Sequence, residues 1–143
     1  MLTGIPIVID GDTIRIGNTR IRPYGIDAPE VRQDCTVSGK VWRCGQEAKN
    51  KLDKIIAKKL VTYSKKYMDR YRRVVAVCRA GSINLNAWMV ENGWAVAYIR
   101  FFKDYVKDER NAKASPKGIW RGQFIMPWDW RKNNTLVSGD IIY

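Results

Sequence analysis

The sequence predicts a small, mainly β protein of the α+β class: a five-stranded, partly open barrel of the OB type that carries three helices. Short β-branched runs follow one another near the N-terminus, and an amphipathic helix pattern lies between the third and fourth predicted strands. A parallel α/β sheet would instead alternate strands and helices throughout. With 143 residues, 45% of them hydrophobic, the chain is long enough for one domain with a buried core.

The predicted barrel begins with three strands. The β-branched runs cover residues 5–9, 13–16 and 19–22, and a Gly-Asn pair between the last two is typical of a two-residue hairpin turn. Residues 46–60 place apolar side chains at three- and four-residue steps with lysines between them. This spacing predicts an amphipathic helix with a basic polar face.

Two strands and two helices complete the prediction. The strands cover about 60–65 and 73–79, and the helices about 84–92 and 104–115. The predicted caps and stops are Asn84 or Asn86 before the first of these helices, Gly93 after it, Asp104 before the second and Pro116 after it.

The predicted domain covers residues 1–120, and residues 121–143 form a C-terminal arm packed on it. The arm has little periodicity, and Trp128 and Trp130 lie close together in it. Large aromatic side chains in a coil-like tail usually anchor it by burial, so we favour an anchoring role over a binding role. No repeat or low-complexity segment indicates a second domain.

The composition limits the chemistry. Lys and Arg number 26 against 14 Asp and Glu, a net charge of +12, which makes a polyanion such as nucleic acid the first partner to consider. The absence of histidine excludes Ser-His-Asp hydrolases and His-ligated zinc enzymes, so catalysis would use carboxylates, other polar groups or a metal. No run of about 18 apolar residues predicts a membrane span, and the opening residues lack a signal-peptide pattern.

The charges are unevenly distributed. Residues 40–73 hold twelve basic and three acidic side chains, whereas residues 10–34 hold five acids against four arginines. Close carboxylates repel one another, and a hard cation such as Ca²⁺ or Mg²⁺ would neutralise Asp12 and Asp27 if their strands are neighbours. An ordinary turn at Asp12 and an ordinary strand end at Asp27 are the alternatives.

Two aspartates with a cation, a third carboxylate at Glu30 and nearby arginines form a set suited to phosphodiester cleavage. A metal polarises a phosphoryl oxygen, a free carboxylate takes a proton from water, and guanidinium groups bind the phosphate oxygens. None of these roles needs histidine.

Six segments of the chain resemble the staphylococcal nuclease, or thermonuclease, family. They are IDGDTIRI (9–16), IRPYGIDAPE (21–30), CGQEAKNKL (44–52), DRYRRVVAV (69–77), INLNAWMVENGWA (83–95) and the Gly-Ile-Trp that ends at Trp120. Their order and spacing cover about residues 5–120. The resemblance implies an OB-fold barrel with three helices and a calcium-dependent nuclease.

The resemblance also implies a metal site. Asp12 and Asp27 match the two calcium aspartates of the family, and Ala28 matches a position that gives only its main-chain carbonyl. Hard oxygen ligands suit both Ca²⁺ and Mg²⁺, and the resemblance favours Ca²⁺.

The catalytic positions carry over in the same way. Glu30 matches the carboxylate that activates or positions the attacking water, and Arg22 and Arg73 match the two arginines that grip the phosphate. Arg72 stands where the family has glycine, so a positive φ there would strain the turn or re-aim Arg73. Arg72 could instead add a phosphate contact.

Tyr71 and Tyr98 match tyrosines near the nucleotide, and packing is the alternative for each. The implied activity is low-specificity cleavage of DNA and RNA that leaves 3′-phosphate ends, by a monomer without a protein partner. The runner-up is a catalytically silent nucleic-acid-binding module on the same fold. A membrane-surface protein would need an amphipathic anchor that the sequence lacks.

Bacterial secreted members of the family carry a cysteine pair like Cys35 and Cys44, which implies a disulfide in the loop that follows Glu30. Two free thiols are the alternative, and Cys78, inside a predicted strand, is expected to be a buried free thiol. A disulfide would indicate a secreted or periplasmic protein whose leader is absent from this sequence, whereas free thiols would fit the cytoplasm.

Overall fold

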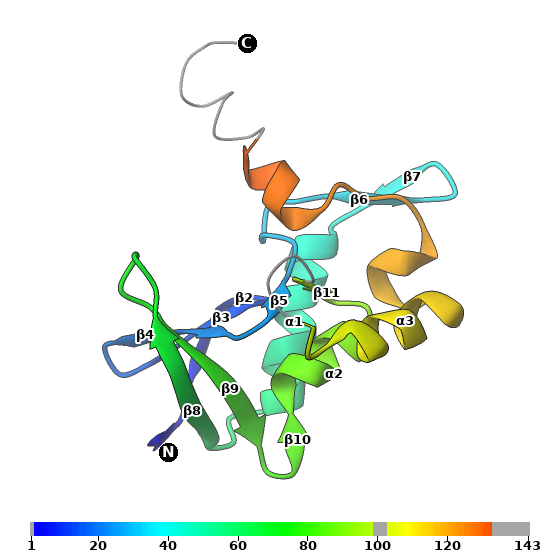
Figure 1. The fold of residues 1–143 in the computed structure, drawn as a ribbon. Helices are drawn as coiled ribbons and strands as arrows, with labels where there is room; N and C mark the ends of the chain where they lie inside the picture. The colour runs from blue at the N-terminus through cyan, green and yellow to red at the C-terminus, as the bar shows by residue number, and fades with distance from the viewer. Residues whose placement is uncertain (1, 99–102, 133–143) are drawn as a thin grey trace, which may run out of the picture.

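The computed structural model describes residues 2–98 and 103–132. Within them, the main sheet has seven strands: six follow the order β1-β8-β9-β4-β3-β2, and the short β10 pairs with β9. The strands are β1 (Leu2–Gly4), β2 (Ile7–Asp10), β3 (Thr13–Ile16), β4 (Thr19–Pro23), β8 (Val61–Met68), β9 (Val74–Ala80) and β10 (Ile83–Asn84). The sheet curls into a half-barrel, which confirms the predicted mainly β fold class (Figure 1).

The five predicted strands are all present, as β2, β3, β4, β8 and β9. The β3–β4 hairpin turns at Gly17, whose φ of 61° suits a residue without a Cβ. Within the main sheet, only the β4–β9 pair is parallel, with Arg22 opposite Val75. This pairing joins the β2–β3–β4 part of the sheet to the β8–β9 hairpin and brings β4 beside the end of that hairpin.

The structure adds further short strands that the sequence did not predict. Two form a pair beside the main sheet, β5 (Ile26–Asp27) and β11 (Val96–Ala97). Two others form a hairpin, β6 (Cys35–Val37) and β7 (Lys40–Trp42). Strands of two or three residues leave no alternating pattern that a sequence window can detect.

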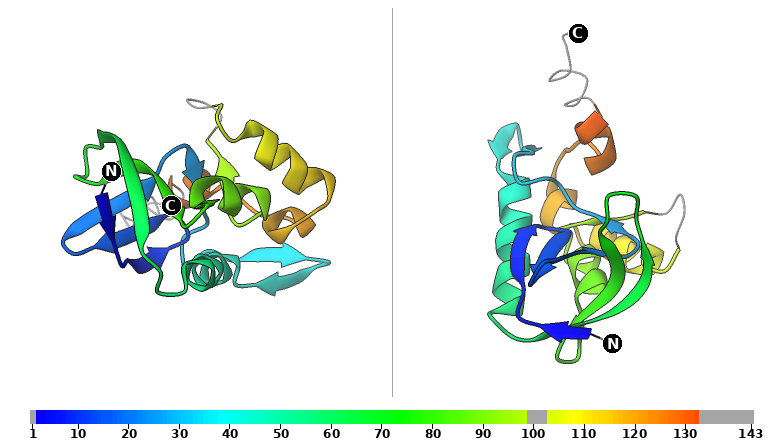
Figure 2. Two further views of the ribbon diagram at one scale, coloured as in Figure 1. Left: turned by 90° about the horizontal axis from the view of Figure 1, so that it is seen from below. Right: turned by 90° about the vertical axis from the view of Figure 1, so that its left-hand side faces the viewer.

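Three helices are present: α1 (Cys44–Ile56), α2 (Leu85–Glu91) and α3 (Val106–Ala114). The curled sheet forms one side of the molecule and α2 and α3 the other, with α1 running between them (Figure 1, Figure 2). No helix in the described ranges is long and apolar enough to cross a membrane.

Two helix-end predictions are wrong. The helix predicted to reach residue 60 ends at Ile56, because Ala57 and Lys58 both adopt positive φ and turn the chain toward β8. Leu60 is 58% exposed, whereas Val61, the first residue of β8, is buried. Asp104 does not cap α3: Tyr105 is the N-cap residue, and Asp104 instead accepts a hydrogen bond from the Tyr24 hydroxyl.

Asn84, one of the two predicted caps of α2, accepts a hydrogen bond from the Ala87 N–H. Asn86 is buried inside the protein, where it holds β9 by accepting from the Cys78 N–H. Cys78 is a buried free thiol, as predicted.

The buried apolar side chains form two clusters. The larger one fills the space between the sheet, α1 and α2, with Ile14, Ile21, Leu52 and Met89 among its members. The smaller one surrounds the Cys35–Cys44 disulfide. It contains Val96 and Ile119 and is covered by Trp42, Trp120, Phe124, Met126 and Trp128.

The C-terminal arm packs on this smaller cluster. Gly118–Arg121 form a 3₁₀ helix, Gln123 bridges to Thr36, and residues 127–132 are helical rather than coil-like. Trp128 packs against the cluster, which agrees with an anchoring role. The predicted arm residues beyond 132 lie outside the described residues.

Candidate active site

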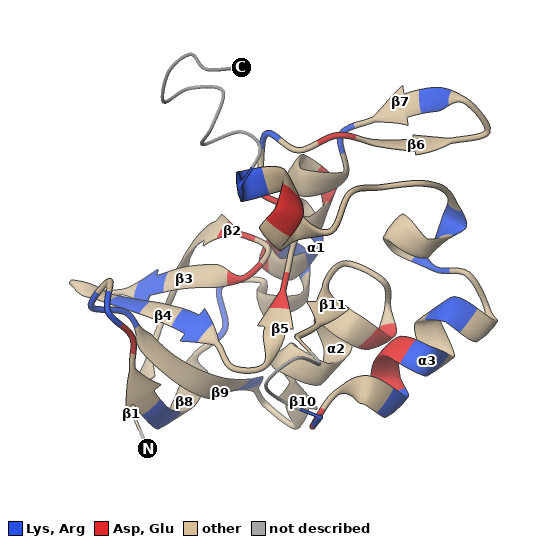
Figure 3. Cartoon of the chain, turned by 45° about the horizontal axis from the view of Figure 1, so that its top comes forward, with Lys and Arg blue, Asp and Glu red and all other residues tan. Residues whose placement is uncertain are grey.

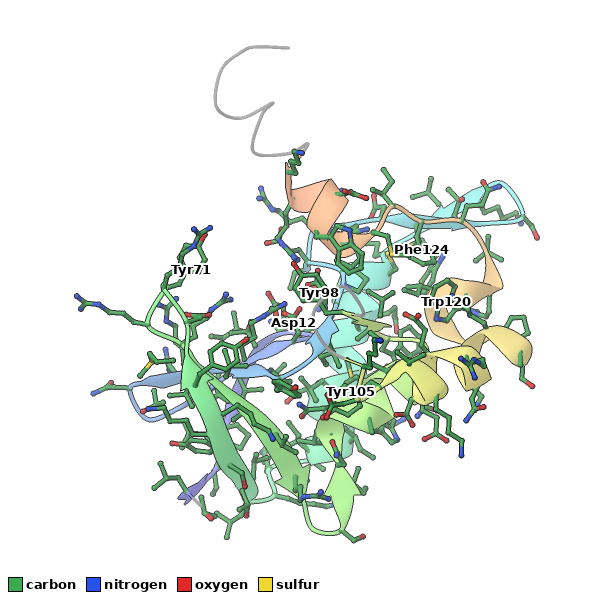
Figure 4. All side chains as sticks on the ribbon, in the orientation of Figure 1. Asp12, Tyr71, Tyr98, Tyr105, Trp120 and Phe124 are labelled. Atoms are coloured by element: carbon green, nitrogen blue, oxygen red, sulfur yellow. A yellow bond between two sulfur atoms is a disulfide. The ribbon has the colours of Figure 1, made fainter. Side chains whose placement is uncertain are left out.

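A pocket of about 700 Å³ opens between three parts of the chain: the β2–β3 turn, the tip of the β8–β9 hairpin and the C-terminal helix. Figure 4 shows Asp12 near the middle of the molecule, between Tyr71 at the hairpin tip and Tyr98. The charged residues that line the pocket are Asp10, Asp12, Arg20, Arg22, Glu30, Asp69, Arg70, Arg73 and Arg131. The pocket therefore collects most of the predicted site residues.

Asp12, Arg22 and Asp27 form the base of this site. Asp12 and Asp27 are 4% and 1% exposed, and Figure 3 shows acidic segments between β2 and β3 and on β5. Arg22 Nη1 lies 3.0 Å from Asp12 Oδ2, and Arg22 Nη2 lies 3.2 Å from Asp27 Oδ1. One guanidinium on β4 thus joins carboxylates from two different strand ends.

These contacts shift the acidities of the carboxyl groups. Burial opposes ionisation of Asp12, but Arg22 and hydrogen bonds from its neighbours hold its pKa below the usual value. Burial and the charge of Asp12 raise the pKa of Asp27 to about 6, against the opposing effect of Arg131 and Arg22. Burial and Asp12 also raise the pKa of Asp10 to about 8. Burial and mutual repulsion therefore disfavour ionisation of Asp10 and Asp27 while Asp12 is ionised.

The donor chemistry fits a hard cation. Asp12 and Asp27 offer buried carboxylate oxygens that repel each other, which is what Ca²⁺ or Mg²⁺ relieves. Within the described residues, no three acidic or cysteine side chains converge enough to hold a metal by themselves. A cation here would complete its shell with main-chain and water oxygens. Ala28, predicted to give its carbonyl, donates its N–H to Asp12 Oδ2 at 2.7 Å.

Glu30 lines the pocket at the start of the loop that leads to the disulfide. The loop is fixed by its backbone: the Gln33 N–H donates to the Glu30 carbonyl at 2.8 Å. Gly45 of α1 packs directly on the Glu30 carbonyl oxygen, with which a Cβ would collide. Because its backbone is fixed in this way, Glu30 is held at the wall of the pocket.

Arg73 enters from the hairpin tip. Its Nε lies 2.8 Å from Asp69 Oδ2, and Asp69 Oδ1 accepts the N–H groups of Tyr71 and Arg73, both at 2.9 Å. Arg72 has a φ of 63°, the left-handed conformation expected at a glycine position. Main-chain hydrogen bonds of Asp69 nevertheless close the turn. Arg72 does not line the pocket.

The two tyrosines predicted to bind substrate both line the pocket. Tyr71 is 55% exposed, and Arg20 Nη2 donates to its carbonyl at 2.6 Å. Tyr98 stacks on Trp128 of the C-terminal helix, with ring centroids 5.2 Å apart. Tyr98 is therefore packed against an aromatic ring, whereas the Tyr71 ring, at the hairpin tip, lies under the guanidinium groups of Arg70 and Arg73.

Sequence reasoning missed five charged residues of the pocket: Asp10, Arg20, Asp69, Arg70 and Arg131. Two of them contact the predicted aspartates. Asp10 precedes Asp12 by two residues, and its Oδ1 accepts the Asp12 N–H at 3.2 Å. Its place in the acidic stretch was a usable signal. Arg131 Nη2 lies 2.6 Å from Asp27 Oδ2, although 104 residues separate the two in the chain. No pattern in the arm marks this contact.

A curled β half-barrel with a pocket of buried aspartates and converging arginines defines a protein class suited to binding a phosphodiester. The chain belongs to the staphylococcal nuclease family: residues 20–122 match the family described as staphylococcal nuclease homologue. The family resemblance expected from the sequence is confirmed.

Several known proteins are similar in sequence to this chain, and two of the three described here are named as nucleases. The succinoglycan biosynthesis protein ExoI of Rhizobium meliloti is 37% identical over 126 residues, which cover 85% of this chain and 66% of that protein. An uncharacterized endonuclease of Haemophilus influenzae is 33% identical over 90% of this chain and 72% of its own length. A micrococcal nuclease of Shigella flexneri is 30% identical over 87% and 77%. The family and these nuclease names support a nuclease role.

Proposed function

We propose that this chain is a calcium-dependent nuclease of low sequence specificity that hydrolyses DNA and RNA to 3′-phosphate products. The observation that carries the proposal is one pocket containing Asp12, Arg22, Glu30 and Arg73, with buried Asp27 bonded to Arg22 at its base. Each group needed for phosphodiester hydrolysis is present there without histidine.

The proposed roles follow from the chemistry of each group. Asp12 and Asp27 hold the Ca²⁺, which when bound supplies a Lewis acid to a phosphoryl oxygen. Glu30 takes a proton from water as the water oxygen bonds to phosphorus and the bond to the 5′ oxygen breaks. The leaving 5′ oxygen takes a proton from solvent. Arg73, together with Arg22, donates hydrogen bonds to the phosphate oxygens.

Low specificity follows from the kind of contacts available. The surplus positive charge lies mainly on lysines and arginines, which bind phosphates without reading bases. Tyr71 is 55% exposed, and the Arg70 and Arg73 guanidinium groups lie 5.1 and 5.4 Å from its ring centroid. We expect a base of any kind to stack at this ring beside these two cations. We therefore expect both DNA and RNA to be substrates, with affinity that falls steeply as salt rises.

The Cys35–Cys44 disulfide supports a secreted or periplasmic location, because disulfides persist in oxidising compartments. We expect the active species to be a monomer that needs no protein partner. Gel filtration of the purified chain tests this directly.

The deciding experiment digests plasmid DNA and single-stranded RNA in Ca²⁺, in Mg²⁺ and in chelator. We expect cleavage of both in Ca²⁺, loss of cleavage in chelator, and a loss of about a hundredfold or more in Glu30→Gln. Asp34→Asn is the matched control, since Asp34 is an exposed acid of the same loop outside the pocket lining.

An unchanged cleavage rate in Glu30→Gln would remove Glu30 from the mechanism. Binding of the polymers without cleavage in either metal would favour the catalytically silent module instead.

A further inference from the structure

We propose that Arg131 is a positioning residue for Asp27, so that the C-terminal arm completes the active site rather than only anchoring the chain end. The inference rests on the proposed function, because it assigns Arg131 a role in holding a cation ligand. It concerns residues 123–132, which lie beyond the part of the chain matched to the family.

The two oxygens of Asp27 are held by two different arginines. Arg22 Nη2 lies 3.2 Å from Oδ1, and Arg131 Nη2 lies 2.6 Å from Oδ2. Asp27 is 1% exposed, and these two contacts fix the plane of its buried carboxylate. A carboxylate has about four lone-pair positions, so two arginine contacts leave acceptor capacity for a cation.

Arg131 reaches Asp27 because the arm is held at several points along its length. The Gln123 and Thr36 main chains exchange hydrogen bonds of 2.8 and 2.9 Å. The buried Gln33 side chain donates from Nε2 to the Ile125 carbonyl at 2.7 Å. Trp128, which precedes Arg131 by three residues on the same helical segment, stacks on Tyr98. These contacts hold the arm in the position from which Arg131 reaches Asp27.

The carboxyl groups beside Arg131 leave room for a cation as well. Arg22 contacts both Asp12 and Asp27, whereas Arg131 contacts Asp27. Asp10 and Glu30 line the same pocket and add two further carboxyl groups. A cation bound by Asp12 and Asp27 would therefore have acidic neighbours as well as the two arginines.

Ligands of a metal are commonly oriented by hydrogen bonds from residues behind them, and loss of such a partner typically weakens metal affinity by about 10- to 100-fold. The test measures Ca²⁺ binding to the full chain by calorimetry, without nucleic acid. We expect Arg131→Gln to weaken Ca²⁺ binding about tenfold or more. Arg131→Lys, which keeps the charge, should recover part of the loss. Lys132→Gln removes an exposed neighbouring charge and should change affinity less than about twofold.

Three results would overturn the inference. Equal Ca²⁺ affinity in both Arg131 variants and in Lys132→Gln would leave the arm as a structural anchor. Tighter binding in Arg131→Gln would show that the guanidinium occupies the place of the cation. An unaltered chain that binds neither Ca²⁺ nor Mg²⁺ would overturn the calcium proposal as well, which separates the two failures. Thermal unfolding of each variant checks that its fold is retained.

Discussion

At the scale of single residues, Asp10 shows how burial and a neighbouring charge keep a carboxyl group of the site protonated. It lies beside Asp12, which Arg22 keeps ionised, and no arginine of the described ranges forms an ion pair with its own carboxyl group. Burial and the negative charge of Asp12 together raise the pKa of Asp10 to about 8. The folded chain without a cation therefore keeps a proton on Asp10 over a wide pH range.

This proton predicts a pH-dependent stability. The folded chain binds more protons than the unfolded chain between the ordinary aspartate value of 3.8 and about 8, so its free energy of unfolding falls as pH rises through that window. Asp10→Asn removes the titration and keeps an oxygen to accept the Asp12 N–H. In chelator, we expect the variant to match the parent at about pH 3.5, below the ordinary aspartate value, and to unfold at a clearly higher temperature at about pH 8.5.

Differential scanning calorimetry at both pH values makes the measurement, with Asp34→Asn as the exposed control. A Tm difference between Asp10→Asn and the parent that does not change with pH would contradict the assigned titration.

At the scale of elements, the β8–β9 hairpin positions Arg73 through its own turn. Asp69 accepts two backbone N–H groups and pairs with Arg73, and these contacts hold the pKa of Asp69 below its usual value despite its burial. Arg72 occupies the left-handed position with its side chain exposed. The strain at Arg72 is therefore local, and the aim of Arg73 depends on Asp69.

Two variants separate these contributions. Asp69→Asn weakens a charge-assisted contact of about 1.5–3 kcal/mol, so we expect cleavage to fall about tenfold as Arg73 loses its fixed position. Arg72→Gly suits the positive φ and should raise stability by up to about 1 kcal/mol while changing the rate less than about threefold. Single-turnover cleavage and urea unfolding measure both effects. A larger rate loss in Arg72→Gly than in Asp69→Asn would show that Arg72 itself contacts the substrate.

At the scale of the whole molecule, the disulfide joins the parts that surround the site. Cys35 lies in β6, beside the bridge to Gln123 of the arm, and Cys44 begins α1. Glu30 lies upstream on the same loop, and Gly45 packs on its carbonyl oxygen. The disulfide therefore connects the Glu30 loop, α1 and the arm through one small apolar cluster.

Loss of the Cys35–Cys44 disulfide should destabilise the Glu30 loop, α1 and the arm together. In the loop-entropy model, a disulfide that closes about ten residues contributes roughly 2.5–3 kcal/mol to stability. We expect the double variant Cys35→Ser, Cys44→Ser to lose about that much, with urea unfolding followed by tryptophan fluorescence. The parent treated with reductant should behave like the variant, since buried Cys78 takes no part. An unchanged midpoint in reductant would show that the bridge does not stabilise the fold.

Local patterns predicted most of the fold, and the family resemblance supplied residues of the site but none of the contacts between them. The five main strands and the three helices follow from periodicity and turn residues that act over a few positions. The helix end at Ile56 could not be predicted from the sequence, because Ala and Lys at positions 57 and 58 are not residue types that indicate positive φ. Likewise Asp104 is an ordinary cap residue until Tyr24, 80 residues away, supplies another partner.

The sequence by itself determined the fold class, the family and the residue types gathered for chemistry at Asp12, Asp27 and Glu30. The fold class follows from local periodicity, whereas the family and the roles of these residues follow from the resemblance of six segments in register along the chain. Only the tertiary structure decided that Arg22 joins both aspartates and that Arg131 holds Asp27 from the arm. Contacts across 104 residues arise from how the arm packs on the disulfide cluster, and local sequence does not encode that packing.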